Sequence, residues 1–317
     1  MAPAISVVIP TYRRETRLAF TLDALAAQTL PRDRFEVIVV RDSADGSLTA
    51  PPPGLEVRFL TLPGPGPAMR RNHGWRQARA PLVAFTDDDC RPAPDWLERL
   101  LEASGGGDAI LEGRTEPDPD EVHLLHGMAR SMQVISADRW YPTCNLAYPR
   151  SLLERLGGFD EALAFFGEDT DLGLRAERLG ARLTYVDEAV VWHAVHVRSP
   201  RLALRDATQR HAESAVIARH PEHRDELYLG AFVGEAHARW VLAALGVVLW
   251  RRSRLLGALA AYPYVAHRLG KRIVQPGFMT PFGVGRAIAD VLGGAFVDGV
   301  EVAMRARSSV RNRRVVL

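Results

Sequence analysis

Short apolar runs alternate with helix-like segments over the first part of the chain. Four runs rich in Val, Ile, Leu and Phe are typical of buried strands and lie at residues 5–9, 35–40, 57–61 and 82–86. Leu18, Leu22 and Leu25 recur at helical spacing after the first run, and Pro67 begins a second predicted helix. Strands that alternate with helices predict an α/β fold, in which helices flank a mostly parallel sheet.

Polar residues follow three of these predicted strands. The clusters occupy residues 11–14, 41–45 and 87–89. The carboxyl ends of parallel strands meet at one edge of a sheet, and ligands bind in the crevice outside that edge. We therefore expect the three clusters to converge on one site.

The rest of the chain divides into two regions. Short strands are predicted at 143–148, 182–186 and 190–193, with one helix after 149 and another that opens at 168–171. From Ser199 onward the pattern is helical, because Ser is a typical N-cap and Pro200 suits the first position of a helix. We predict a first domain at residues 1–198 and a helical C-terminal extension at 199–317.

Composition narrows the class of protein. Of 317 residues, 47% are hydrophobic and 25% are charged, which is typical of a globular protein with a large core. The net charge of +2 and the lack of a basic–aromatic pattern give no support to nucleic-acid binding. Cys90 and Cys144 are too few for a disulfide framework, which favours a reducing compartment. With no visible signal peptide, we expect a cytoplasmic protein.

The C-terminal region combines apolar and basic residues. Apolar stretches at 240–250 and 255–267 flank an arginine-rich turn, and neither reaches the ~20 residues of a membrane span. Five arginines and no acid follow Glu301. This pattern fits peripheral contact with the inner face of an anionic membrane. It equally fits a helical cap with a solvated basic tail, and the sequence leaves both interpretations open.

Three consecutive acids carry the most informative chemistry. Asp87, Asp88 and Asp89 follow an apolar run that is predicted to be a buried strand. Carboxylates in such a place are costly unless a positive charge binds them. Hard divalent cations prefer oxygen ligands, so a metal ion would supply that charge. The alternative is a solvated acidic turn.

Several motifs occur in order along the chain: VVIPTYRR at 7–14, RDSADGS at 41–47, RNHG at 71–74, FTDDD at 85–89, GGFDE at 157–161 and GEDTDL at 167–172. Taken together, they resemble the motifs of the family 2 glycosyltransferases, which have the A-type nucleotide-diphospho-sugar transferase (GT-A) fold. The second motif is a residue short and has Arg in place of one Asp. The resemblance covers about residues 4–195, and the C-terminal third matches only loosely.

The resemblance implies a divalent metal, Mg²⁺ or Mn²⁺, that bridges the two phosphates of a sugar nucleotide. Asp89 is the first choice of ligand, Asp87 supports the metal directly or through water, and Asp88 meets the ribose hydroxyls. His193 completes the metal site by resemblance, with His196 as a weaker alternative. The other interpretation of His193 is a half-buried histidine at the end of a strand.

The same resemblance assigns donor recognition to residues near the first two strands. Uridine-type recognition would fall to Pro10, Tyr12 and Asp42, because a tyrosine ring can stack on a base and a carboxylate can accept from a ring N–H. The alternative is a loop tyrosine and a turn-forming Asp. Arg71 would contact the diphosphate, or it is a surface cation of its helix.

Catalysis by a family member needs one carboxylate to take the proton of the acceptor hydroxyl. By resemblance Asp169 is this general base, Glu168 helps to orient the acceptor, and Asp171 is a helix-capping acid. Family membership implies inversion by direct displacement. Glu168 and its neighbours also suit a helix N-terminus through the helix dipole alone.

Two other functions compete with glycosyl transfer. A sugar nucleotidyltransferase would carry a Gly-rich first loop, whereas residues 10–15 contain no glycine. A non-catalytic protein that binds sugar nucleotide or membrane could lose the acids, yet Asp89 and Asp169 are present. The expected partners are a nucleotide-diphosphate sugar and a hydroxyl acceptor, which would be a glycan, a lipid-linked sugar or a small molecule. The sequence does not identify the donor sugar.

Overall fold

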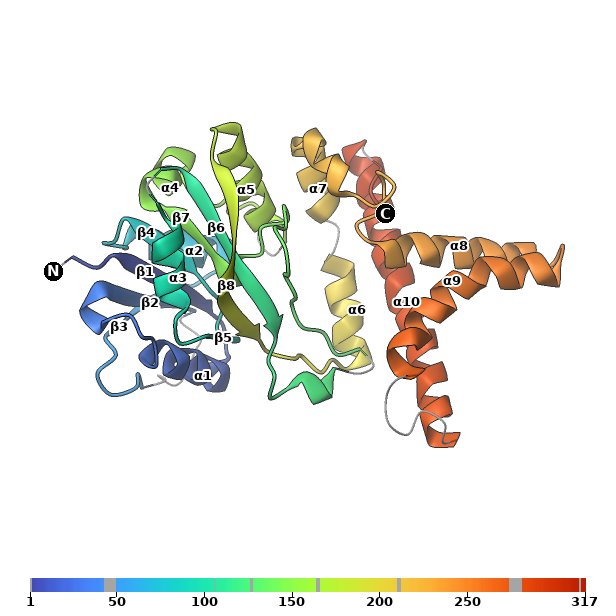
Figure 1. Cartoon of the computed structure of the whole chain (residues 1–317). Helices are drawn as coiled ribbons and strands as arrows, with labels where there is room; N and C mark the ends of the chain where they lie inside the picture. Colours follow the sequence, from blue (N-terminus) through green and yellow to red (C-terminus); the bar gives the residue numbers. More distant parts are fainter. Residues whose placement is uncertain are drawn as a thin grey trace. The chain divides into compact units, whose positions relative to one another are not determined.

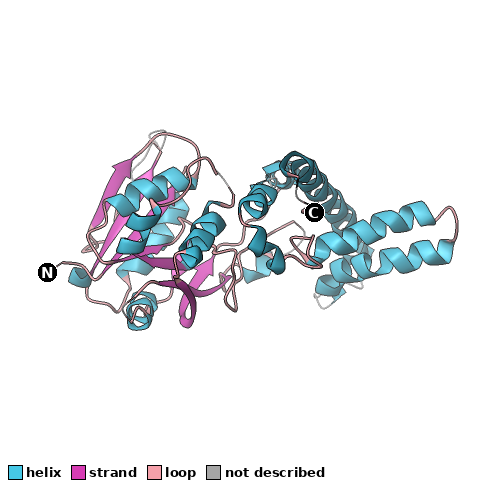
Figure 2. Ribbon diagram, turned by 90° about the horizontal axis from the view of Figure 1, so that it is seen from above, coloured by secondary structure: helices cyan, strands magenta, loops and turns pink. Residues whose placement is uncertain are grey.

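The protein is described by a computed structural model at residues 2–42, 50–105, 107–125, 128–163, 166–209, 212–273, 281–313 and 315–317. Contacts divide the chain into two compact units. The first comprises Met1–Leu125 with Arg130–His196, and the second His126–Ala129 with Val197–Leu317. Figure 1 shows a helix-flanked sheet in the first unit and a group of helices in the second, and Figure 2 shows them from above.

Within the described residues, eight strands form one sheet in the order β3-β2-β1-β4-β7-β6-β8-β5. The strands are β1 (Ile5–Thr11), β2 (Phe35–Arg41), β3 (Val57–Thr61), β4 (Leu82–Phe85), β5 (Cys90–Pro92), β6 (Ala109–Pro117), β7 (Leu146–Pro149) and β8 (Arg182–His193). Pairing is parallel from β3 through β4 and between β6 and β8. It is antiparallel on both sides of β7 and between β5 and β8. The predicted α/β class is confirmed, and the parallel arrangement describes the first half of the sheet while the second half is mixed.

The second half of the sheet differs most from the sequence prediction. The segments 182–186 and 190–193 form the single strand β8, with a shift of register opposite Gly113 and Thr115 of β6. Two acids in the middle of β8 resemble a turn in sequence, but pairing with β6 continues beyond them. The short strand β5 was not predicted, because its Cys-Arg-Pro sequence has little strand propensity and depends on β8 for its hydrogen bonds.

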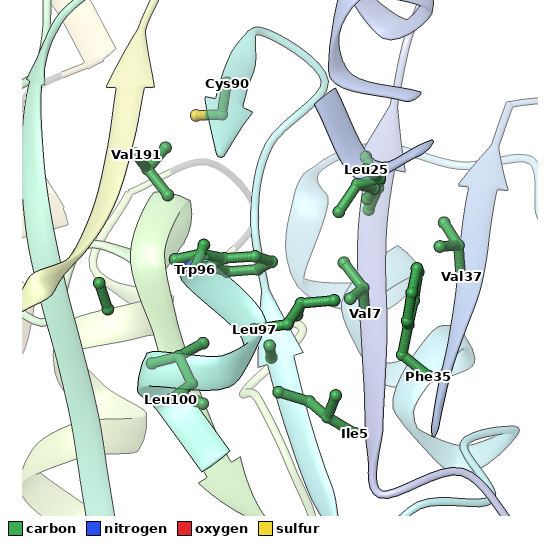
Figure 3. Close-up of a cluster of buried hydrophobic side chains, with 14 of the residues drawn as sticks. Ile5, Val7, Leu25, Phe35, Val37, Cys90, Trp96, Leu97, Leu100 and Val191 are labelled. Carbon is green, nitrogen blue, oxygen red and sulfur yellow. The ribbon is translucent and has the colours of Figure 1, made fainter. Parts of the chain in front are cut away.

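A core of apolar side chains lies between one face of the sheet and two helices, α1 (Glu15–Ala26) and α3 (Trp96–Ala103). Ile5 and Val7 alternate toward this core along β1. Leu25 of α1 and Trp96 of α3 belong to the same core and are fully buried (Figure 3). Every residue of β1 is buried, so this strand is a rigid base for the polar residues that follow it.

Helix α2 (Pro67–Arg76) packs on β1 and β2, and a glycine allows the close approach. A Cβ atom at Gly74 would lie 2.4 Å from Val8 Cγ1 and 3.1 Å from Val40 Cγ2. The glycine of the RNHG motif therefore has a packing role. It sets the helix near the strands, one turn beyond Arg71.

The first unit contains two further α-helices and several short 3₁₀ turns. They are α4 (Arg150–Leu156) and α5 (Glu168–Arg178), with 3₁₀ turns η1 (Arg32–Arg34), η2 (Val122–Leu124) and η3 (Thr143–Asn145). Helix α4 contacts both α5 and β7. The sequence predicted the starts of α4 and α5 closely, because Pro149 and the acids at 168–171 mark them.

The second unit is built of helices. They are α6 (Pro200–Gln209), α7 (Ala212–Arg219), η4 (Pro221–Glu226), α8 (Glu235–Leu249), α9 (Arg254–Ile273) and α10 (Pro281–Asn312). Pro200 begins α6, and the N–H of Leu202 donates to Ser199 Oγ at 3.3 Å, so the predicted cap is confirmed. Among the described residues, no helix combines the length and the apolar character needed to cross a membrane.

The basic C-terminal segment is part of this helical unit. Arg305 is fully buried and donates to Glu213 and to Glu301 Oε2. The backbone N–H of Leu317 donates to Ala231 at 2.7 Å, and its carbonyl accepts from Val233 at 2.9 Å. The interpretation of a solvated basic tail is therefore wrong for Arg305, whose charge is neutralised within the fold.

The packing at Gly74 predicts an unusual effect of alanine. Gly74→Ala should lower the free energy of unfolding by about 1–3 kcal/mol, because the new methyl group overlaps Val8. In an exposed helix the same change should stabilise by about 1 kcal/mol. Gly285→Ala in α10 is the matched control, since a Cβ there meets nothing within 4 Å. Urea unfolding followed by circular dichroism measures both, and equal gains would contradict the close approach.

Candidate active site

The first and third polar clusters meet at Asp88, which follows β4. Thr11 Oγ1 donates to Asp88 Oδ2 at 2.7 Å, and the N–H of Tyr12 donates to the same oxygen at 3.4 Å. Arg14 Nη1 donates to Asp88 Oδ1 at 3.1 Å. Since β1 and β4 are parallel neighbours, their carboxyl ends bring these side chains together as expected.

Asp88 and Asp89 are adjacent and buried but have opposite pKa shifts. Burial, and then the charge of Asp89, raises the pKa of Asp88 to about 7. Burial would also raise the pKa of Asp89, but the hydrogen bond to His196 and the charges of His193 and Arg14 hold that pKa well below its ordinary value. Asp89 is therefore the member of this pair that stays ionised over the wider pH range.

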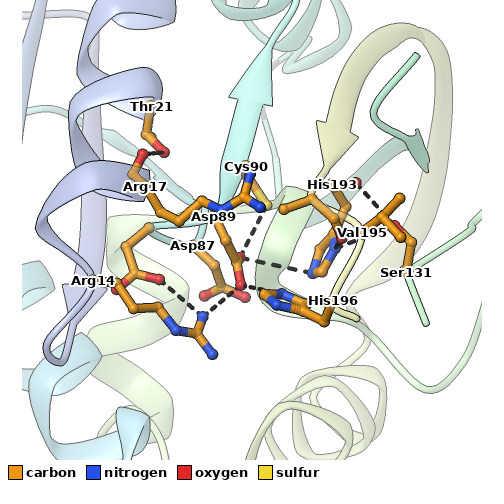
Figure 4. Close-up of polar contacts among 12 residues, drawn as sticks. Arg14, Arg17, Thr21, Asp87, Asp89, Cys90, Ser131, His193, Val195 and His196 are labelled. Carbon is orange, nitrogen blue, oxygen red and sulfur yellow. Dashed lines mark hydrogen bonds and ion pairs between the residues drawn. The ribbon is translucent and has the colours of Figure 1, made fainter. Parts of the chain in front are cut away.

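Both candidate histidines face Asp89 (Figure 4). His196 Nε2 lies 2.8 Å from Asp89 Oδ2, and His193 Nε2 lies 3.7 Å from Asp89 Oδ1. His193 Nδ1 lies 2.9 Å from the carbonyl oxygen of Ala194. A hydrogen bond from Nδ1–H to this oxygen would leave Nε2 as the ring nitrogen available to a bound cation. His196, the weaker alternative from sequence, makes the closer contact.

Strand β5 places Asp89 beside these histidines. Cys90 opposes His193 in the β5–β8 pair, and the N–H of Ala194 donates to the Asp89 carbonyl at 2.9 Å. One possible ligand atom from each of Asp89, Cys90 and His193 lies within 4.8 Å of the others. Burial raises the pKa of Cys90, so it stays a thiol and a poor ligand. The remaining carboxylate and imidazole are a donor set that fits a divalent cation.

Arg71 joins the acidic triplet to helix α5. Its guanidinium is buried, with Nη2 donating to Asp87 Oδ1 at 2.8 Å and Nη1 donating to Glu168 Oε1 at 2.9 Å. Its Cζ also lies 5.8 Å from the centroid of the Phe159 ring. The interpretation of Arg71 as a surface cation is therefore wrong. Its two terminal nitrogens face carboxylates, and its contact with a diphosphate stays a prediction.

Asp169, the second residue of α5, is half-buried beside Glu168. Burial, and then the charge of Glu168, raises the pKa of Asp169 to about 8, although Arg71 opposes the shift. Burial also raises the pKa of Glu168, whose Oε2 lacks a hydrogen-bond partner among the described residues. A carboxylate with a pKa near 8 is a stronger base than an ordinary aspartate once it is ionised, although most of it still holds its proton at neutral pH.

The loop that leads to α5 is anchored by the RNHG motif. Asn72 Nδ2 donates to the carbonyl of Phe159, and Asn72 Oδ1 accepts from the N–H of Phe159, both at 2.9 Å. Arg175 of α5 donates to Asp171 Oδ2 and to the Gly158 carbonyl, both at 2.7 Å. Asp171, considered from sequence as a capping acid, thus pairs with Arg175 and helps to hold this loop.

The predicted donor-recognition residues lie near the ends of β1 and β2. Tyr12 is 48% exposed, and Arg70 Cζ lies 5.7 Å from its ring centroid. Arg70 Nη2 also donates to Asp42 Oδ2 at 2.9 Å. Pro10 is buried within β1 and lies in register with Val40 of β2, so its role in donor recognition stays a prediction. Residues 43–49, the rest of the second predicted loop, lie outside the described residues.

Two arginines of this site were not singled out from sequence. Arg14 contacts two acids of the triplet, and Arg70 contacts Asp42 and the ring of Tyr12. The signal was present, since Arg14 ends the first polar cluster and Arg70 adjoins Arg71. Which of several neighbouring arginines turns toward an acid depends on packing that the sequence does not display.

The fold defines the class of the protein. PcManGT, a mannosyltransferase from Pyrobaculum calidifontis in complex with GDP-Man and Mn²⁺, has a similar structure with a TM-score of 0.58 at 19% identity. The match covers 99% of this chain and 88% of that one. This likeness is one of fold, and it confirms the predicted GT-A class.

Sequence comparison then gives the family. Residues 6–155 match the family model of glycosyl transferase family 2, and residues 119–270 match that of glycosyl transferase family group 2. The succinoglycan biosynthesis protein ExoM of Rhizobium meliloti (strain 1021) is 30% identical over 221 residues, which cover 63% of this chain and 69% of ExoM. The chain belongs to glycosyl transferase family 2, as its motifs predicted.

Another relative is matched over a smaller share of its own length. Validoxylamine A glucosyltransferase of Streptomyces hygroscopicus subsp. limoneus is 29% identical over 239 residues, covering 62% of this chain and 53% of that protein. The chain therefore spans about half the length of this relative.

The raised pKa of Asp169 predicts a pH-dependent cost to stability. The folded chain keeps this proton up to about pH 8, whereas the unfolded chain releases it near the ordinary value of 3.8. The contribution of Asp169 to stability is thus full below the unfolded value and is lost as the pH rises toward 8. Each pH unit in this window should cost up to about 1.4 kcal/mol.

Asp169→Asn should remove this dependence. Relative to the wild type, the variant should gain stability as urea unfolding is moved from about pH 5.5 to about pH 9. Asp33→Asn, at an exposed position, is the matched control. A gain that does not change with pH would show that Asp169 does not hold its proton in the folded chain.

Proposed function

We propose that this protein is a metal-dependent inverting glycosyltransferase that moves a sugar from a nucleotide-diphosphate sugar to an acceptor hydroxyl. One observation carries the proposal: Arg71 binds both Asp87, beside the candidate metal site, and Glu168, beside the candidate base. Membership of glycosyl transferase family 2 supports the reaction class. Residues 1–198 would form the catalytic domain and 199–317 a helical extension.

Asp89 and His193 would hold the divalent cation, with Asp87 in support. Such an ion supplies Lewis-acid stabilisation of the charge that gathers on a departing diphosphate. Asp89 suits this role because its carboxylate stays ionised at low pH. Arg14 Nη1 lies 2.5 Å from Asp89 Oδ2 and supplies positive charge to the same carboxylate. A bound metal ion would replace part of this ion pair. His196 would then orient Asp89.

Asp169 would act as the general base. The acceptor hydroxyl loses its proton to the Asp169 carboxylate as its oxygen attacks the anomeric carbon, and the bond to the diphosphate breaks in the same displacement. One attack from the face opposite the leaving group inverts the anomeric carbon. Glu168, fixed by Arg71, would orient the acceptor.

Donor recognition would use the residues at the ends of β1 and β2. Tyr12 offers an exposed ring for stacking on a base, and Asp42 offers a carboxylate to a ring N–H. Asp88 now accepts hydrogen bonds from Thr11 and Arg14. It would give up these bonds and bind the ribose hydroxyls in their place. The fold neighbour PcManGT is in complex with GDP-Man and Mn²⁺, and these are the first donor and metal to try.

The metal role predicts a difference between the two histidines. His193→Ala should raise the Mn²⁺ concentration for half-maximal binding by about 10–100-fold, whereas His196→Ala should have a smaller effect. Titration with Mn²⁺ in a calorimeter measures both, with His123→Ala at an exposed position as control. A larger effect at His196 would transfer the ligand role to that residue. No binding in the wild type would contradict the metal site.

The base role predicts separation of binding from turnover. Asp169→Asn should lower kcat by about 10²–10⁴-fold. It should keep the thermal shift that a bound sugar nucleotide and Mn²⁺ produce. UDP-, GDP- and dTDP-sugars would be screened, with release of nucleoside diphosphate as the assay.

Asp171→Asn is the matched control, because Asp171 lies on the same helix but pairs with Arg175. It should keep most of the turnover. Full activity in Asp169→Asn would remove Asp169 as the base. The kcat/KM of the wild type should also rise with pH and level off above about pH 8, the pKa at which Asp169 loses its proton.

A further inference from the structure

Helices α8 and α9 of the second unit form an antiparallel hairpin with an apolar tip. The two helices pack on each other (Figures 1 and 2), and the turn between them spans residues 250–253. Many large apolar side chains near this turn are exposed: Leu245, Val247, Val248, Leu249, Trp250, Leu255, Leu256, Leu259 and Tyr262. Val247 and Leu255 are about 70% exposed, at 73% and 69%. We call these nine residues, with Arg251, Arg252 and Arg254, the hairpin tip.

The contacts that hold α8 and α9 together and against α10 do not bury the tip residues. A Cβ at Gly246 would lie 2.8 Å from the Gly257 carbonyl oxygen, so the two helices approach closely through small residues. Contacts with α10 come from elsewhere along the hairpin. Trp240 Nε1 donates to the Ala295 carbonyl at 2.7 Å, and Arg268 pairs with Asp298. The apolar tip residues are thus a surface of the second unit rather than part of its core.

Charge is strongly segregated around the tip. Between Glu235 and Asp290 the sequence has seven arginines and Lys271 but no Asp or Glu. The three tip arginines are exposed, and they lie directly between the apolar ends of α8 and α9. A tip that is both apolar and positively charged matches a surface with negative headgroups above a hydrocarbon layer. Trp250 suits the boundary between the two, where tryptophan is enriched.

We propose that the hairpin tip docks this protein on an anionic lipid surface. The tip lies on the surface rather than across the bilayer, since no described helix is long and apolar enough to span one. Pairing with the same tip of a second copy is disfavoured, because a two-fold contact would bring two sets of arginines together and the sequence between Glu235 and Asp290 has no acid to offset them. Arg305 is not part of this role, because it forms buried ion pairs with Glu213 and Glu301. The inference goes beyond glycosyl transfer and does not depend on it.

Vesicle co-sedimentation tests this docking with the full chain. The probes are vesicles of phosphatidylcholine alone and vesicles with about one third phosphatidylglycerol. The wild type should bind the anionic vesicles at least about tenfold more strongly, and binding should weaken in high salt because exposed charges are screened. Fluorescence of Trp250 should shift to shorter wavelength on binding, and this shift should be absent in Trp250→Phe.

Two variants separate the apolar and basic parts of the tip. The double change Val248→Ser and Leu255→Ser should lower binding by about tenfold or more, since each removes exposed apolar area without touching the core. The triple change of Arg251, Arg252 and Arg254 to Gln should remove the preference for anionic vesicles. Leu229→Ser, at an equally exposed apolar position of the same unit but outside the tip, is the control and should bind as the wild type does.

Three outcomes would overturn the proposal. The first is a wild type that stays in the supernatant with anionic vesicles. The second is tip variants that bind these vesicles as well as the control does. The third is a dimer in sedimentation equilibrium that the Val248 and Leu255 changes abolish, because the tip would then bind a second copy of the chain. None of these measurements uses sugar transfer, so their failure would leave the proposed reaction untouched.

Discussion

The buried guanidinium of Arg71 is the contact on which the candidate site depends. It lies between carboxylates that come from distant parts of the chain, Asp87 after β4 and Glu168 at the start of α5. Removal of one partner from a buried ion pair typically costs about 3–5 kcal/mol, because the other charge stays desolvated. Arg71 therefore ties the residue before Asp88 and Asp89 to the residue before Asp169. It also limits the repulsion among acids that burial would otherwise make prohibitive.

Arginine suits this role better than lysine would. A planar guanidinium has donors on two terminal nitrogens and stays charged when buried, whereas a lysine offers one compact charge. Arg14 also bridges two acids, but it contacts both Asp88 and Asp89 through the single nitrogen Nη1. The acids nevertheless differ in the direction of their pKa shifts. Asp89 is surrounded by positive groups and its pKa falls, while burial dominates at Asp88 and Asp169 and raises the pKa of each.

Some residues of the family motifs hold the scaffold. Gly74 permits contact between α2 and the strands, and Asn72 fixes the loop at Phe159. Asp171 binds Arg175, which in turn holds the same loop. A motif match therefore identifies the family more directly than it identifies which residues touch a substrate.

The sequence by itself determined the strands of the first half of the sheet, the starts of several helices and the family. Apolar runs predicted β1 to β4, prolines and acids marked the starts of α2, α4 and α5, and ordered motifs pointed to glycosyl transferase family 2. These features are encoded locally, in spacing and composition, and so they can be recognised without contacts.

Only the tertiary structure decided which residues contact one another and which are buried. Strand β5 has little propensity of its own, yet its pairing with β8 brings His193 and His196 to Asp89. The burial of Arg71 and the exposure of the hairpin tip could not be predicted from the sequence either. The residue type alone does not show whether an arginine or a valine faces the core or the solvent. Burial and partner choice depend on residues far apart in the chain, and these become neighbours only when the sheet and the helices pack.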